Sequence, residues 1–156
     1  MKLFNRILFP VDFSDMSPKI VPWVLAMGKS LDSEVHMLFV ARRLEYFSAV
    51  NIEYVCIKNF QNEIVRGAEL KMEEFKSKHF NEHIPCKTKV VLGDAAEEIL
   101  KYVESARIDL VIMGTHGRKR LEKLFFGSVA DKVIKTSNVP VLSINPHRVA
   151  SVKGTE

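Results

Sequence analysis

Glycine and basic residues cluster between Gly114 and Val133, and their types and spacing suit the binding of an anion. The segment reads GTHGRKRLEKLFFGSVADKV, with further glycines at Gly117 and Gly127 and with Ser128 directly after the last. Glycine lets backbone amides approach an anion closely, and its positive-φ conformations can aim several N–H groups at one point. A helix that begins at Ser128 would direct its free amides and its positive dipole end at the same anion. The segment therefore predicts a phosphate-binding loop.

Side chains in this loop add donors for an anion. Thr115 and Ser128 carry hydroxyl groups, and Arg118 and Arg120 could close over a polyphosphate. Folding alone offers a competing explanation, because glycine is common after strands and before helices, and Ser128 is a good N-cap without any ligand. The combination of strand, GxxG, nine residues, GlySer and helix, with concentrated positive charge, favours the anion site.

The composition is that of a single globular domain, which we expect to span residues 1–146, with a flexible tail at 147–156. The chain has 156 residues, of which 47% are hydrophobic and 27% charged. The net charge is +4, and residues 118–123 alone contribute +3, so the excess charge is mostly local. A broad basic face of the kind that nucleic acid needs is not indicated. No apolar run is long enough to cross a membrane, and we expect a cytoplasmic protein.

Strand and helix patterns alternate along the chain. Five apolar segments predict strands, at residues 4–11, 34–41, 85–92, 109–113 and 139–144. Four segments predict helices, at residues 17–30, 59–79, 95–106 and 128–136. Residues 42–57 show no clean period and predict a loop or a mobile helical turn. The alternation predicts an α/β fold, a doubly wound sheet of five parallel strands with helices on both faces. Ligands of such sheets bind beyond the carboxyl ends of strands, where the strand order reverses.

The predicted helices carry several more detailed expectations. Ser14 or Ser17 would cap the first helix, and Pro22 inside it would bend it. The second helix would turn an apolar stripe inward, made of Phe60, Ile64, Ala68, Met72 and Phe75. The third would turn Ile99, Tyr102 and Val103 inward.

At this point the chain resembles the universal stress protein family. The resemblance rests on the pattern G-2x-G-9x-G-(S/T), complete here in Gly114, Gly117, Gly127 and Ser128, and on ILFPVDFSDMS, LGDAAEEIL, DLVIMGTHG and VPVLSI. It covers residues 3–146. The resemblance implies a Rossmann-like sheet with strand order 3-2-1-4-5, ATP binding, and a homodimer formed through the last strand, between Val139 and Ile144.

The resemblance also implies which residues hold the nucleotide. Pro10, Val11 and Asp12 would line the adenosine side, and Val40 would contact the adenine, largely through its backbone. Val11 stands where many members have threonine, so one hydroxyl is missing here. The full expected set, with the two donors argued from the loop itself, is Pro10, Val11, Asp12, Val40, Met113, Gly114, Thr115, Gly117, Arg118, Gly127, Ser128 and Val129.

The expected site contains phosphate donors but no obvious catalytic base, which favours a nucleotide-binding sensor or regulator over an enzyme. AMP or ADP could replace ATP, and Mg²⁺ or Mn²⁺ could accompany the nucleotide through Asp12. Slow ATP hydrolysis stays an alternative, as does a nucleotide-free interaction protein that acts through its basic loop and dimer edge. The sequence identifies no protein partner.

Two further patterns imitate known sites. The triplet GKS at residues 28–30 resembles the end of a P-loop but lacks the earlier glycine and falls at the end of a helix. The segment HFNEH at residues 79–83 fits the zinc motif HxxEH, but Pro85 follows at once and a solvated helix end is the better interpretation.

Isolated histidines and cysteines are assigned structural roles. His36 lies in a strand, and we expect it to be hydrogen-bonded in the core or at an edge. Cys56 and Cys86 lie 30 positions apart without a CxxC partner, and we expect both to be buried, reduced thiols. His147 would lie in a loose tail.

Overall fold

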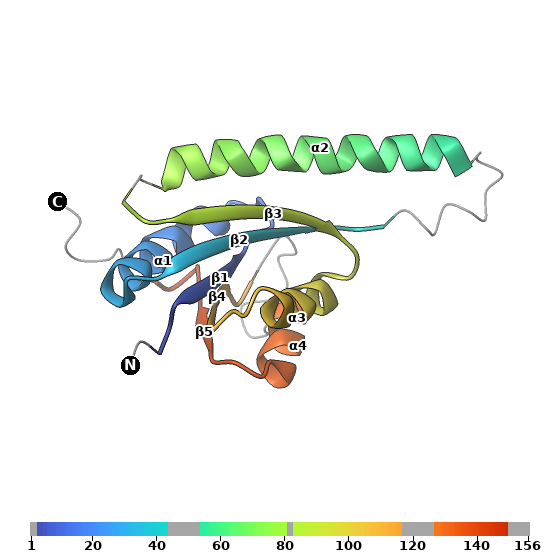
Figure 1. Ribbon diagram of the computed structural model, residues 1–156. Helices are drawn as coiled ribbons and strands as arrows, with labels where there is room; N and C mark the ends of the chain where they lie inside the picture. The colour runs from blue at the N-terminus through green and yellow to red at the C-terminus, as the bar shows by residue number, and fades with distance from the viewer. Residues whose placement is uncertain (1–2, 44–53, 81–82, 117–126, 150–156) are drawn as a thin grey trace.

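The computed structural model describes residues 3–43, 54–80, 83–116 and 127–149, and a five-stranded parallel sheet forms its centre (Figure 1). The strands are β1 (Arg6–Pro10), β2 (Glu34–Ala41), β3 (Cys86–Leu92), β4 (Leu110–Gly114) and β5 (Val141–Ile144). The helices are α1 (Ser17–Leu31), α2 (Tyr54–His79), α3 (Ala95–Ser105) and α4 (Ser128–Thr136). The strand order is β3-β2-β1-β4-β5, with every pairing parallel. The predicted fold class and strand order are confirmed.

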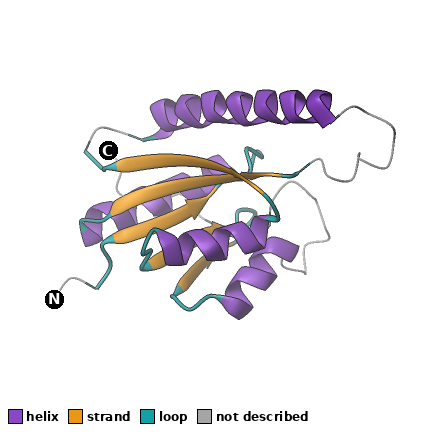
Figure 2. Cartoon of the chain, turned by 45° about the vertical axis from the view of Figure 1, so that its right-hand side comes forward, coloured by secondary structure: helices purple, strands orange, loops and turns teal. Residues whose placement is uncertain are grey.

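Helices cover both faces of the sheet (Figure 2). On one face, Ile7 and Phe9 of β1 pack with residues of α1 and with Met72 of α2. On the other, Leu8 of β1 packs with residues of α3 and α4, among them Ile99. Alternate residues of one strand therefore enter two separate apolar clusters, which explains why β1 is apolar throughout.

The strand order reverses at β1, which lies between β2 and β4. Register pairs Pro10 of β1 with Leu38 of β2, and Leu8 of β1 with Val111 of β4. Because all strands are parallel, their carboxyl ends lie at one end of the sheet, where the described residues of the predicted site lie.

The start of α1 differs from the prediction, because neither serine caps the helix. The N-cap is Met16, without a side-chain cap. The Ser17 hydroxyl donates to Asp12 Oδ1 at 2.9 Å, and Ser14 Oγ accepts from the Met16 amide at 3.3 Å. The Asp12 carboxylate, an acceptor only, thus engages the Ser17 hydroxyl. Pro22 lies inside the helix as expected; the bend stays a prediction.

Helix α2 begins at Tyr54, so the predicted loop or mobile turn at 42–57 is wrong for its last four residues, and residues 44–53 lie outside the described chain. Ala68 and Met72 are buried as predicted. Phe60, predicted to face inward, is 60% exposed. Figure 1 shows the reason: the first turns of α2 reach past the ends of the strands, where no sheet lies beneath the helix.

The chain remains packed on the sheet beyond β5. The Asn145 carbonyl accepts from the amides of Arg148 and Val149, and Pro146 is buried. Val149 packs against the apolar cluster of α1 and α2. This turn also brings His147 against His116 of the glycine segment, with ring centroids 5.2 Å apart.

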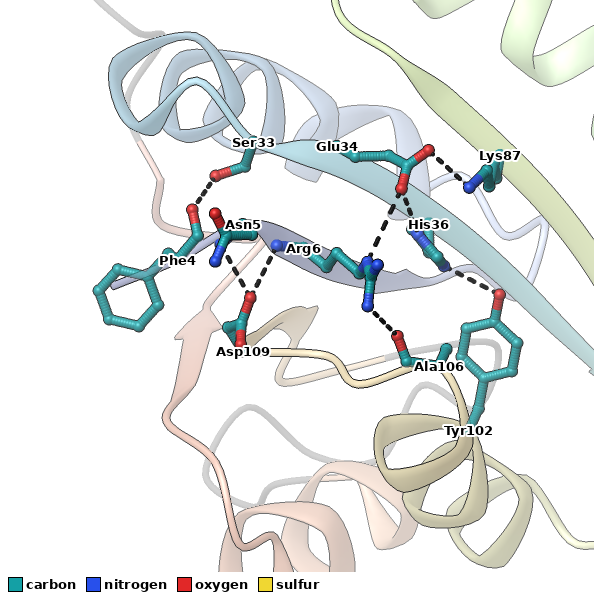
Figure 3. A network of polar contacts seen from close by, with 10 residues as sticks. All are labelled: Phe4, Asn5, Arg6, Ser33, Glu34, His36, Lys87, Tyr102, Ala106 and Asp109. Atoms are coloured by element: carbon teal, nitrogen blue, oxygen red, sulfur yellow. Dashed lines mark hydrogen bonds and ion pairs between the residues drawn. The ribbon is translucent and has the colours of Figure 1, made fainter. Parts of the chain in front are cut away.

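The amino ends of the strands are joined by a polar network (Figure 3). Glu34 accepts from Lys87 Nζ at 2.8 Å and from His36 Nε2 at 3.1 Å, which joins β2 to β3. The other ring nitrogen of His36 lies 3.0 Å from the Tyr102 hydroxyl of α3. The prediction of a hydrogen-bonded core histidine is confirmed.

A second carboxylate extends this network to β1 and β4. Asp109, directly before β4, accepts from the amides of Asn5 and Arg6 at 2.8 and 2.9 Å. The Arg6 side chain donates to the Ala106 carbonyl at the end of α3. Four strands and one helix are therefore connected at the amino ends of the strands, opposite the predicted site.

The described helices and the two cysteines can be compared with the predictions. None of the helices in the described ranges is long and apolar enough to cross a membrane. Cys56 is exposed, so the prediction of two buried thiols is wrong for this residue, which lies on the overhanging part of α2. Cys86 is partly buried, and burial raises the pKa of its thiol to about 11.

We predict that replacing Glu34 weakens the fold and flattens its response to acid. The hydrogen bond from Lys87, followed by that from His36, lowers the pKa of Glu34 below 4.5. Ionised Glu34 therefore stabilises the fold above pH 4.5, and this contribution is lost as the pH falls through the lowered folded-state pKa. Glu34→Gln should lower the free energy of unfolding by about 1 kcal/mol at neutral pH. On acidification the variant should lose less stability than the wild type.

Urea unfolding of this variant at a series of pH values provides the measurement. The matched control is Glu104→Gln, which changes an exposed glutamate of α3. Identical acid profiles for wild type and Glu34→Gln would contradict the assignment.

We predict two clearly different thiol reactivities. In the native protein a thiol-reactive aromatic disulfide should modify Cys56 rapidly and Cys86 only slowly, because the attacking species is the thiolate. Cys56→Ser should remove the fast phase alone, and Cys86→Ser the slow phase alone. Equal rates for the two thiols at neutral pH would show that Cys86 is not protected.

Candidate functional site

Backbone hydrogen bonds connect the carboxyl end of β1 to β2, and the carboxyl end of β4 to β5 and to the start of α4. The Val11 amide, after β1, donates to the Leu38 carbonyl of β2 at 2.9 Å. The Thr115 amide, after β4, donates to the Ile144 carbonyl of β5 at 2.9 Å. The Thr115 carbonyl in turn accepts from the Gly127 amide at 2.8 Å. The third glycine of the motif is thus held directly against the end of β4.

The residues at and just after the end of β1 differ in how deeply their side chains are buried. The side chain of Val11 is buried in the cluster of α1 and α2 and contributes packing. Pro10 and Asp12 are half-buried. Asp12 Oδ1 accepts from the Ser14 amide and from the Ser17 hydroxyl, both at 2.9 Å. The carboxylate is therefore oriented by the turn that leads into α1.

The end of β4 leaves little room for a side chain. A Cβ at Gly114 would lie 3.3 Å from the His116 carbonyl oxygen and 3.5 Å from Ile20 Cδ1. The first of these distances is tighter than most Cβ contacts in proteins, and the second is an ordinary contact. Met113, one residue earlier, is buried in the cluster of α3 and α4. Gly114 therefore allows the chain to fold back closely over α1.

The side chains of Thr115 and His116, directly after Gly114, are hydrogen-bonded to each other. Thr115 is only 6% exposed, and its hydroxyl lies 2.8 Å from His116 Nδ1. The Nε2 atom of His116 is buried without a hydrogen-bond partner in the described part of the molecule. The Thr115 hydroxyl, expected as a phosphate donor, is thus already engaged by His116.

Helix α4 begins without a side-chain cap. Its N-cap is Gly127, and its first helical hydrogen bond runs from the Asp131 amide to the Gly127 carbonyl. The amides of Ser128, Val129 and Ala130 therefore precede the helical ladder and form its electropositive end. This is the arrangement of donors that binds phosphate groups at helix N-termini.

Of the two properties of glycine considered for this motif, a positive φ is used by neither Gly114 nor Gly127. Gly127 has φ −58°, and Gly93 is the only described glycine with a positive φ. Close approach applies to Gly114, whereas a Cβ at Gly127 would lie 3.4 Å from the Thr115 carbonyl oxygen, at the limit of ordinary contact. Two other predicted residues, Gly117 and Arg118, lie outside the described residues.

Val40 lies near the carboxyl end of β2, at the same end of the sheet. It is half-buried and packs against the cluster of α3 and α4. The structure adds two residues that sequence reasoning missed: Phe13, which follows Asp12 in a left-handed conformation, and Ile20, which supports Gly114. Ile20 could have been suspected from its place in the first turns of an amphipathic helix; the sequence gives no signal for Phe13.

The GKS triplet and the HFNEH segment do not contribute to the candidate site. Residues 28–30 lie in the last turn of α1, as predicted. Helix α2 ends at His79, whose ring lies against Phe75, so His83 is not on the same helix. Burial, with a smaller contribution from Lys78, lowers the pKa of His79. Across the described ranges, no group of three or more His, Cys, Asp or Glu side chains is placed to hold a metal ion.

Comparison with known proteins agrees with the motif and the fold. The model of the Universal stress protein family matches residues 3–145. Universal stress protein MJ0577 of Methanocaldococcus jannaschii is 32% identical over 154 residues, which cover 91% of this chain and 95% of the relative. Universal stress protein YxiE of Bacillus subtilis is 29% identical and covers 91% and 99%.

Solved structures give the same result. The structure of MJ0577 superposes with a TM-score of 0.78 at 31% identity, covering 96% of this chain and 99% of that one. The structure of the universal stress protein from Archaeoglobus fulgidus in complex with dAMP has a TM-score of 0.66 at 16% identity, with coverage of 92% and 99%. The latter likeness shows a shared fold. With the family model matched over nearly its whole length, this chain belongs to the universal stress protein family.

Proposed function

We propose that this protein binds ATP at the carboxyl ends of β1, β2 and β4 and acts as a nucleotide-dependent regulator or sensor in the stress response. The observation that carries the proposal is the hydrogen bond from the Gly127 amide to the Thr115 carbonyl. This bond holds the uncapped start of α4 beside the end of β4, within the full glycine pattern of the family. Backbone donors and a helix dipole then converge where a polyphosphate would lie.

The proposed roles divide the site into two halves. Gly114, Gly127, Ser128 and Val129, with Gly117, would hold the phosphates through backbone amides and the Ser128 hydroxyl. Positively charged Arg118 would add a bidentate contact. Met113 and Thr115, both buried, would support this half from below.

The adenosine half would be formed by the ends of the neighbouring strands. Pro10 and Asp12 would line it from β1 and Val40 from β2, while buried Val11 would act through its backbone and its packing. Mg²⁺ or Mn²⁺ could reach the phosphates near Asp12, and AMP or ADP would occupy the same half. The dAMP complex of the Archaeoglobus fulgidus protein supports an adenine nucleotide as the ligand class.

We predict that ATP raises the melting temperature of the wild type, and that Gly127→Val reduces this shift to half or less. At 100 times the dissociation constant, ATP should add about 2.7 kcal/mol, which is roughly 5–10 °C for a chain of this size. Valine at position 127 would place methyl groups against the Thr115 carbonyl at the start of α4. Calorimetry should then show affinity weakened at least about tenfold, or about 1.4 kcal/mol.

Gly67→Val is the matched control, because a Cβ at Gly67, on the exposed surface of α2, meets no atom within 4 Å. This variant should bind ATP as tightly as the wild type. Wild-type protein without a thermal shift at millimolar ATP would instead favour a nucleotide-free interaction protein. Unchanged ATP affinity in Gly127→Val would refute the proposed phosphate cradle.

We also propose that two copies pair through β5, the strand at one edge of the sheet. An unpaired edge is a template for a second strand, and Ser143 on this edge is exposed.

Sedimentation should give twice the chain mass of 17.8 kDa for the wild type. Ser143→Glu should give the single-chain mass, because like charges would meet along the shared edge. Ser30→Glu, on the exposed end of α1, should remain dimeric; a monomeric wild type would rule out the pairing.

A further inference from the structure

The residue directly after Asp12 has a backbone conformation that its side chain disfavours. Phe13 has φ 57°, in the left-handed region that glycine adopts freely and bulky residues rarely adopt. Such conformations persist only where the surroundings impose them, and they cluster at functional sites. The position of this one, at the carboxyl end of β1, calls for a physical account.

The turn around Phe13 orients the Asp12 carboxylate. Asp12 Oδ1 accepts from the Ser14 amide at 2.9 Å, so the side chain of Asp12 and the backbone of Ser14 close a small ring over Phe13. The same oxygen accepts from the Ser17 hydroxyl in the first turn of α1. Both bonds depend on the chain reversing sharply at Phe13, which a left-handed residue provides.

The ring of Phe13 is held by two other elements. Its centroid lies 4.5 Å from that of Phe39 on β2, with a 35° angle between the rings. It also lies 6.5 Å from the ring of Phe75 on α2, at 64°. All three rings are partly buried against the cluster of α1 and α2. Aromatic pairs in these geometries are favourable, and they offset the strain in the backbone.

We propose that Phe13 is a positioning residue for the nucleotide site. Its ring, held between Phe39 and Phe75, keeps the backbone left-handed and thereby fixes the Asp12 carboxylate and the start of α1. Phe39 immediately precedes Val40, so one aromatic contact connects the two strand ends assigned to adenosine. The inference rests on the proposed function, and it adds α2, through Phe75, to the elements that shape the site.

The first experiment measures ATP affinity by calorimetry in Phe13→Gly, at a temperature where the variant is fully folded. Glycine relieves the strain and removes the ring, so the turn loses its anchor and the dissociation constant should rise at least about tenfold. Phe75→Ala removes the support from α2 without altering the turn and should raise it by about threefold. Val103→Ala, in the apolar cluster of the opposite face, is the control for general destabilisation and should leave affinity unchanged.

The second measurement is hydrogen exchange of the Ser14 amide in the protein without nucleotide. Exchange should be at least about tenfold faster in Phe13→Gly than in Val103→Ala, because the bond to Asp12 Oδ1 opens more often. Wild-type ATP affinity or wild-type Ser14 protection in Phe13→Gly would overturn the inference while leaving the phosphate cradle intact. A wild type that binds no ATP would remove the proposed function, and this inference with it, whatever the exchange rates.

Discussion

The hydrogen bond between the Gly127 amide and the Thr115 carbonyl is the constraint on which the site depends. It attaches the start of α4 to the end of β4, and the Thr115 amide continues the connection to Ile144 of β5. A Cβ at position 127 would lie 3.4 Å from the accepting carbonyl oxygen, so a larger, branched side chain would crowd this connection. The start of α4 therefore lies beside the carboxyl end of β4, and its N-cap residue Gly127 offers no side-chain cap. The proposed phosphate site rests on this connection, because helix N-termini bind anions through their free amides.

The two ends of the strands are connected by different kinds of hydrogen bond. At the amino ends, Glu34, His36 and Asp109 join neighbouring strands through charged and neutral hydrogen bonds (Figure 3). At the carboxyl ends, the connections run mainly through backbone groups and through the turn after Asp12. Loops carried on a rigid scaffold are the usual place for ligand binding, and the fastening at the opposite edge supplies that rigidity. The strained backbone at Phe13 lies on the binding side.

Hydrophobic periodicity was enough to predict the elements and the fold class, because each strand and helix must bury its apolar face. The inward residues of α3, Ile99 and Val103, were predicted correctly for this reason. Periodicity gives the direction of an apolar face but not the extent of the sheet beneath it, so exposed Phe60 was missed. The predicted serine caps were wrong: the Ser17 hydroxyl donates to the Asp12 carboxylate, and Ser14 lies before the N-cap residue Met16. The left-handed Phe13 had no signal, since residue type favours that conformation only for glycine and small polar residues. The site residues themselves came from the glycine pattern and the family resemblance, and the distances that relate them required the structure.

Backbone amide NMR shifts during an ATP titration test the central claim most directly, because the proposed contacts are made by amides. The account predicts that the largest saturable shifts occur at Gly114, Gly127, Ser128 and Val129. The amides of Glu34 and His36, at the opposite edge of the sheet, should remain nearly unchanged. Saturable shifts confined to the amino-end network, or no shifts at millimolar ATP, would contradict the account.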